Sequence, residues 1–200
     1  MNSPHLNNID KALAKASERY DFVLVPGIND SGPEHWQSFW QKRHGFWLRV
    51  AQSRWNNPDI GLWIDAIRRL LETTRRPAIL VGHSFGALAS CCVTASGQHK
   101  IAGLMLVAPA EPARFEVEDR VPTTPLGVPC IVVASHNDPV VRFPRAVYWS
   151  KVWNANLADV GEAGHINAES GFGPWPYGLQ VLKDLVETID TRGGEPPAGA

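Results

Sequence analysis

The stretch Ala78-Ile79-Leu80-Val81-Gly82-His83-Ser84-Phe85-Gly86-Ala87-Leu88 joins an apolar run to a G-x-S-x-G turn and then to helix-forming residues. Four apolar residues in succession are typical of a parallel strand that is covered on both faces. Gly82 and Gly86 have no Cβ, so a strand and a helix can approach closely enough to hold Ser84 in a strained turn. The pattern predicts a nucleophile elbow that projects the Ser84 hydroxyl at the carboxyl edge of a sheet, and the alternative is an inert strand–helix turn.

Two backbone N–H groups are candidates for stabilising a negative charge beside Ser84. The helix that begins after Ser84 offers its N-terminal dipole and the N–H of Phe85. In an elbow-type enzyme the second donor comes from the loop after an earlier strand, just beyond a glycine. The loop after the apolar run at residues 21–25 contains such a glycine. We therefore expect Ile28, or else Asn29, to complete an oxyanion hole, and the alternative is a plain turn.

A serine hydroxyl is a poor nucleophile near neutral pH, so Ser84 needs a base and a carboxylate that orients the base. Asp138 follows the apolar run at residues 129–134, and His165 follows a last short run at 156–160. In a parallel sheet both loops open on the edge that carries Ser84, and the chain order Ser, Asp, His is that of elbow hydrolases. We predict that Ser84, Asp138 and His165 form a catalytic triad. Taken alone, an aspartate at this position is typical of a turn or a helix cap, and a histidine is typical of a surface loop.

Two other histidines lie close to the predicted triad. His83 lies inside the turn itself, which aims it away from Ser84, so we expect a packed neighbour. His136 shares a turn with Asp138, so it ranks below His165 as the base.

The remaining apolar runs alternate with helical patterns. Besides the run before Ser84, strands are expected at 21–25, 46–50, 102–107, 129–134 and 156–160, with the mixed run 46–50 near an edge. Between them, one helix is expected to begin with Asn57 as its cap and Pro58 in its first turn. Alternating strands and helices imply right-handed crossovers. The predicted fold is α/β, a doubly wound sheet of about six mostly parallel strands with helices on both faces.

The domain boundaries follow from composition. A chain of 200 residues with 44% apolar content can bury one core. We expect an N-terminal extension at 1–20, a single domain at 21–190, and a disordered Gly/Pro/Ala-rich tail at 191–200. The proline-rich segment 109–128 has little helical pattern and is too short for a large lid.

Charge and cysteine content limit the partners and the compartment. The net charge is −1 without a basic block, so we expect neither a nucleic-acid nor a membrane partner. The three cysteines are an odd number in apolar surroundings, which favours a reducing compartment. Residues 1–20 carry charges and no apolar block, so we expect no signal peptide and a cytoplasmic protein.

Four motifs together resemble a known family. They are Val25-Pro26-Gly27, Gly82-His83-Ser84-Phe85-Gly86, His136-Asn137-Asp138-Pro139 and Gly164-His165-Ile166-Asn167-Ala168-Glu169-Ser170-Gly171-Phe172-Gly173. The chain from about residue 21 to 190 is similar to the small serine hydrolases of the YdeN and retinoblastoma-binding-protein-nine type. The resemblance implies an α/β-hydrolase fold without a large lid, with Ser84, Asp138 and His165 as the triad. One departure is Pro26, where many α/β-hydrolases have histidine.

The expected function is hydrolysis of a small ester, thioester or amide through an acyl-enzyme on Ser84, by a carboxylesterase-like or aminopeptidase-like enzyme. The alternative is a hydrolase-like scaffold that mainly binds another protein. We expect a small-molecule acyl substrate, a monomer or small homo-oligomer, and no metal or cofactor, since the sequence has no phosphate loop or Cys/His ligand set. The candidates for lining the pocket are Asn29, His35, Trp36 and Trp175.

Overall fold

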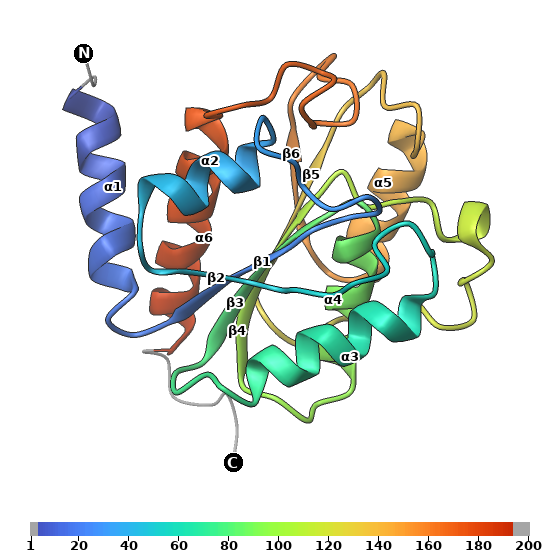
Figure 1. Ribbon diagram of the computed structural model, residues 1–200, viewed down its shortest axis with the longest axis horizontal. Coiled ribbons are helices and arrows are strands. Elements are labelled where there is room, and N and C mark those ends of the chain that lie inside the picture. Colours follow the sequence, from blue (N-terminus) through green and yellow to red (C-terminus); the bar gives the residue numbers. More distant parts are fainter. Residues whose placement is uncertain (1–3, 194–200) are drawn as a thin grey trace.

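The computed structural model describes residues 4–193, whose six strands form one sheet (Figure 1). The strands are β1 (Asp21–Val25), β2 (Trp47–Arg49), β3 (Ala78–His83), β4 (Ile101–Val107), β5 (Cys130–Ala134) and β6 (Asn156–Asp159). Their order is β2-β1-β3-β4-β5-β6, and every adjacent pair is parallel. The predicted six-stranded α/β sheet is confirmed, with β2 at an edge.

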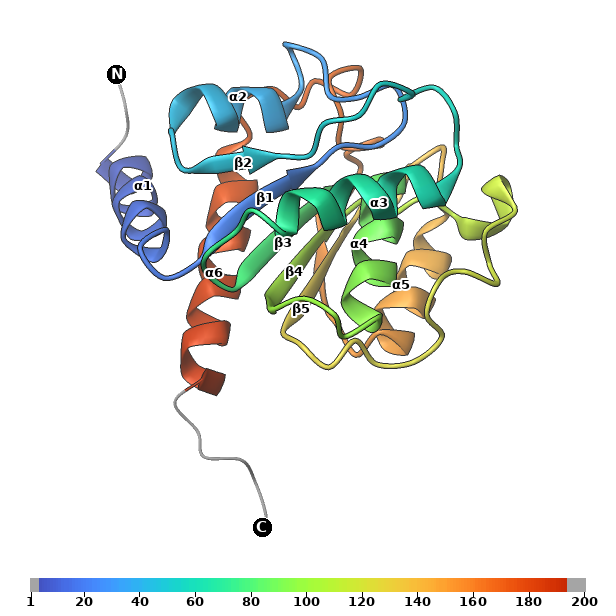
Figure 2. The same ribbon diagram turned by 60° about the horizontal axis from the view of Figure 1, so that its bottom comes forward.

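Helices cover both faces of the sheet (Figures 1 and 2). One face carries α1 (Pro4–Ala16), α2 (Trp36–Arg43) and α6 (Pro176–Gly193), and the other carries α3 (Ile60–Leu71), α4 (Phe85–Ala95) and α5 (Phe143–Val152). Successive side chains of a strand point to opposite faces, so Phe22 and Leu24 join the first core and Val23 and Val25 the second. Both faces are buried, which explains the continuous apolar runs of the central strands.

The start of α3 differs from the sequence prediction. The N-cap is Asp59, whose carboxylate accepts a hydrogen bond from the Gly61 N–H at 2.9 Å, and the helix begins at Ile60. The prediction of Asn57 as the cap, with Pro58 in the first turn, is therefore wrong. Asn and Asp are equally favoured caps, so their types could not decide between positions 57 and 59.

The segment before β1 packs on the domain. Ile9, Leu13 and Ala16 of α1 are buried in the same core as α6. Arg19 pairs with Asp190 of α6 at 2.8 Å. Helix α6 continues to Gly193, so residues 191–193 of the expected tail are helical. The rest of that tail, 194–200, lies outside the described residues.

The connection between β4 and β5 contains one short 3₁₀ helix, Pro112–Phe115, and no lid domain, and all of it is described. The carboxyl edge of the sheet is therefore left open above β3. None of the helices between residues 4 and 193 is long and apolar enough to cross a membrane.

Candidate active site

Ser84 stands at the turn between β3 and α4, with φ 54° and ψ −121°. Such a backbone costs free energy and persists only where the surroundings enforce it. Here two glycines allow the close packing that does so. A Cβ on Gly82 would lie 2.7 Å from the Cα of Ala87, and a Cβ on Gly86 would overlap the carbonyl oxygen of Pro26. The elbow therefore depends on both glycines of the G-x-S-x-G pattern.

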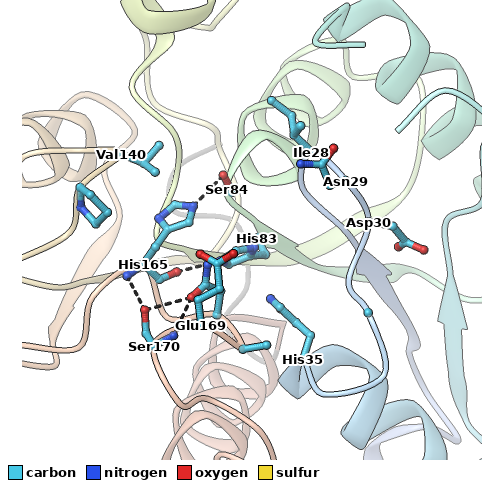
Figure 3. Close-up of a pocket in the computed structure, with 14 residues that line it drawn as sticks. Ile28, Asn29, Asp30, His35, His83, Ser84, Val140, His165, Glu169 and Ser170 are labelled. Carbon is cyan, nitrogen blue, oxygen red and sulfur yellow. Dashed lines mark hydrogen bonds between the residues drawn. The ribbon is translucent and has the colours of Figure 1, made fainter. Parts of the chain in front are cut away.

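Ser84, His165 and Asp138 form a continuous hydrogen-bonded chain. The Ser84 Oγ lies 2.9 Å from the His165 Nε2, and the His165 Nδ1 lies 2.9 Å from the Asp138 Oδ2 (Figure 3 shows the first contact). The His165 side chain is 11% exposed and that of Asp138 is fully buried. The structure thus brings together the three residues that the sequence placed at separate strand ends.

The hydrogen bonds around Asp138 determine which nitrogen of His165 carries the proton. A carboxylate can only accept, so the Nδ1 of neutral His165 donates to it and the Nε2 presents a lone pair to the Ser84 hydroxyl. Asp138 also accepts from the backbone N–H of Val140 at 2.7 Å and of Val141 at 3.3 Å. These bonds hold the carboxylate in place and leave Nε2 as the basic nitrogen.

The loop that carries His165 is held by two side chains whose role sequence reasoning missed. His83 donates from Nε2 to the carbonyl oxygen of His165 at 2.9 Å, and Trp36 donates from Nε1 to that of Ile166 at 2.9 Å. Ser170 Oγ accepts the N–H of His165 at 3.1 Å. Burial holds the pKa of His83 well below its usual range, so this histidine is a neutral support.

A second set of contacts joins the β5 loop to the His165 loop. Ser135 Oγ accepts from the N–H of Ala163 at 2.8 Å, and Asn137 Oδ1 accepts from the N–H of Gly164 at 2.7 Å. The only sequence signal for them is a run of short polar residues after an apolar strand. These bonds fix the spacing between Asp138 and His165.

His136, the lower-ranked candidate base, lies on a different part of the surface. Its Nε2 is 2.8 Å from the Asp159 Oδ2, and both side chains are about half exposed. It is therefore engaged with a partner outside the Ser84 chain.

A pocket of about 360 Å³ opens beside Ser84. The expected residues Ile28, Asn29 and His35 line it. Trp36 and Trp175 do not, so the prediction is wrong for both. Their rings pack 5.2 Å apart in the core beneath α2, because a large apolar side chain gains more by full burial.

The pocket also has lining residues that the sequence did not indicate. Asp30 and Glu169 contribute carboxylates, and Val140 supplies an apolar wall. Among the described lining residues there is no lysine or arginine. Arg49, which is not one of the lining residues, forms an ion pair with Asp30 at 2.6 Å. The negative charge of Asp30 is therefore balanced better than that of Glu169. The pocket therefore favours neutral or cationic groups over anions.

The two candidates for the second oxyanion donor differ in their contacts. The N–H of Asn29 donates to the carbonyl oxygen of Trp55 at 2.8 Å, so it is occupied. Ile28 faces the pocket that also contains Ser84 (Figure 3). The N–H of Phe85, at the start of α4, has no partner within its helix. No backbone hydrogen bond from the N–H of Phe85 or of Ile28 is found among residues 4–193, so these two groups stay the candidates for the oxyanion donors.

Three free cysteines lie in the part of the chain that the structure describes. Burial raises the pKa of Cys92 to about 11, and it raises those of Cys91 and Cys130 as well. Thiols in such surroundings are poor nucleophiles because the thiolate is the reactive form. No group of three or more His, Cys, Asp or Glu side chains in residues 4–193 is arranged to hold a metal ion.

Fold and site together define an α/β-hydrolase. The family model described as serine hydrolase matches residues 22–184, and the chain belongs to that family. The chain is also 54% identical to a YdeN-like hydrolase from Pectobacterium atrosepticum, with a TM-score of 0.89 over 91% of this chain and 98% of the other. The protein is thus a hydrolase of the serine hydrolase family, as the resemblance implied.

More distant structures share the fold. The ydeN gene product of B. subtilis is 20% identical, with a TM-score of 0.70 over 84% of this chain and 99% of the other. Mouse alpha/beta hydrolase domain-containing protein 10 is 13% identical, with a TM-score of 0.64 over 86% and 90%. A search of curated proteins found no match.

Proposed function

We propose that this protein hydrolyses a small ester, thioester or amide through an acyl-enzyme on Ser84. The observation that carries the proposal is the unbroken hydrogen-bonded chain from Ser84 through His165 to Asp138. A serine in such a chain can be deprotonated as it attacks, which an isolated serine cannot.

In the first half-reaction the His165 Nε2 takes the Ser84 proton while Oγ attacks the carbonyl carbon. The carbonyl electron pair moves onto oxygen, where the N–H groups of Phe85 and Ile28 stabilise it by roughly 3 kcal/mol per donor. Asp138 stabilises the imidazolium. The tetrahedral intermediate then collapses, and the leaving alcohol, thiol or amine takes the proton from His165.

In the second half-reaction water replaces the leaving group. The water oxygen attacks the carbonyl carbon of the acyl-enzyme while His165 accepts one proton from the water. The same two N–H groups hold the oxyanion. Collapse breaks the bond to Ser84 Oγ, which recovers its proton from His165. The acid is released and the enzyme returns to its starting state, without a cofactor.

The shape and charge of the pocket support a small, uncharged or cationic substrate. Its volume of about 360 Å³ is near the low end of ligand pockets, and no lid domain covers it. The carboxylate of Glu169 disfavours acyl groups that carry a negative charge.

A fluorophosphonate probe tests the proposal, because it reacts quickly only with a serine that has both a base and an oxyanion hole. Native protein is expected to be labelled once, at Ser84. Labelling should disappear in Ser84→Ala and nearly disappear in His165→Ala, but persist in Ser53→Ala, a control at an exposed serine.

A folded protein that fails to react would reject the proposal. The hydrolase-like scaffold that binds another protein would then be the better description. Heat-unfolded protein is the second control, since unfolding separates Ser84 from His165 and should abolish labelling.

A further inference from the structure

His35 is the last residue before α2 and lies in the pocket beside Ser84, with 5% of its surface exposed. Its Nδ1 accepts a hydrogen bond from the backbone N–H of Gln37 at 3.2 Å, so it caps the helix. An accepting nitrogen carries no proton. Burial, with smaller contributions from Arg49 and His165, lowers the pKa of His35 to about 3. The ring is therefore neutral near pH 7, and its one proton is on Nε2.

This Nε2–H group is buried and has no hydrogen-bond partner among the described residues. Four other described side chains have a buried, unpartnered polar atom: Trp47, Gln52, Arg68 and Trp149. None of these four lines the pocket with Ser84, whereas His35 does. In Figure 3 a ring nitrogen of His35 points into the pocket, toward His83 and Glu169. An unpaired buried donor is unfavourable and calls for an explanation.

Helix capping does not explain why the residue is a histidine. Asn, Asp and Ser are the favoured N-cap residues, because a short side-chain oxygen reaches the free N–H groups directly. Any of them could accept from Gln37 without burying a second polar atom. The additional feature of the imidazole is the Nε2–H that it directs into the pocket.

We propose that His35 is a substrate-recognition residue, whose Nε2–H donates a hydrogen bond to an uncharged ether, hydroxyl or carbonyl oxygen elsewhere on the molecule that Ser84 attacks. This inference rests on the proposed function. An uncharged acceptor fits the surroundings, because the neutral ring adds no positive charge and the carboxylate of Glu169 repels a second carboxylate.

This donor favours substrates that offer it a hydrogen-bond acceptor over substrates that leave it unpaired. An oxygen-bearing substrate satisfies the Nε2–H, whereas a hydrocarbon of the same shape leaves this buried donor unpaired. A penalty of this kind corresponds to about tenfold or more in kcat/KM. The preferred oxygen must enter the pocket fully, since Nε2 is buried.

Two substitutions separate recognition from helix capping. His35→Asn places an amide near the position of Nδ1, so it keeps a cap acceptor but has no donor at the depth of Nε2. His35→Gln places its amide nitrogen near the position of Nε2, so it can keep the donor. Thermal unfolding of both variants measures the contribution of the cap.

The substrates are pairs of aliphatic esters in which one methylene is replaced by an ether oxygen, at successive positions of the acyl chain and of the alcohol. Hydrolysis is followed by acid release in a pH-stat, and each kcat/KM is divided by the ester's alkaline hydrolysis rate. The wild type is expected to prefer the ether by about tenfold at one position. His35→Gln should keep much of this preference, and His35→Asn should lose it.

The preference should also be constant between pH 5 and 8, because the His35 ring stays neutral there. If no ether position is preferred, or if His35→Asn keeps the preference, the inference is wrong. It is equally wrong if both variants lose the preference in proportion to their loss of thermal stability, which would indicate a structural role only. Turnover that survives Ser84→Ala would instead reject the proposed function, so the two failures can be distinguished.

Discussion

The His35→Asn substitution should make the folded protein less sensitive to acid. The pKa of buried His35 is lowered to about 3, whereas a histidine in the unfolded chain titrates near its ordinary pKa of 6.5. Between these two values the unfolded chain binds a proton that the folded chain does not. The contribution of His35 to stability is therefore complete above the unfolded pKa and is lost as the pH falls from there toward the folded pKa.

The size of the effect follows from the same two values. At pH 5.0 the unfolded histidine lies about 1.5 pH units below its pKa, and each unit corresponds to about 1.4 kcal/mol. When the pH is lowered from 7.5 to 5.0, the unfolding free energy should therefore fall by about 2 kcal/mol more in the wild type than in the variant. The pKa of His83 is lowered too, but His83 is present in both proteins, so its contribution cancels in the comparison.

Urea unfolding followed by tryptophan fluorescence measures this difference, since the chain has eight tryptophans. Urea titrations of both proteins are carried out at pH 7.5 and at pH 5.0. The slopes of the unfolding transitions are compared to verify that the two denatured states are alike. Equal losses in the two proteins, or a larger loss in the variant, would refute the conclusion that His35 is buried and neutral.

Three further outcomes are expected. Asp138→Asn should leave the circular dichroism spectrum unchanged but lower kcat by up to about 10⁴, since the His165 tautomer is no longer held; normal turnover would remove Asp138 from the mechanism. Gly86→Ala should destabilise the fold by about 1–3 kcal/mol or more in urea unfolding, because its Cβ meets the carbonyl oxygen of Pro26, and an unchanged midpoint would contradict this packing. Short acyl esters should be hydrolysed faster than long-chain lipids, and a rise in rate at an oil–water interface would argue against the open, lidless pocket.

The elbow and the sheet could be predicted because their signals are local. An apolar run with glycines on both sides of Ser84 restricts the backbone within a few residues, whatever the rest of the chain does. Parallel strands also place all their carboxyl ends at one edge, so the positions of Asp138 and His165 after apolar runs were enough to predict that they meet there. The observed contacts of 2.9 Å from His165 to each partner agree with that prediction.

The composition of the pocket could not be predicted in the same way. Trp36 and Trp175 are near the relevant loops in sequence, but a tryptophan can line a pocket or fill a core, and only its packing under α2 decided for the core. The choice between Ile28 and Asn29 depends on a hydrogen bond to Trp55, which lies on a loop more than twenty residues further along.

The sequence by itself thus determined the fold class, the elbow and the three residues at the strand ends, because these depend on periodicity, glycine geometry and strand direction. Tertiary structure alone decided which aromatic rings are buried, and that the Nε2–H of His35, beside Ser84, has no hydrogen-bond partner within residues 4–193. The physical reason is that each of the latter is a relation between loops distant in the chain. Whether a polar group is hydrogen-bonded and whether a ring is buried depend on contacts between such loops, and the neighbouring residues in the sequence do not reveal them.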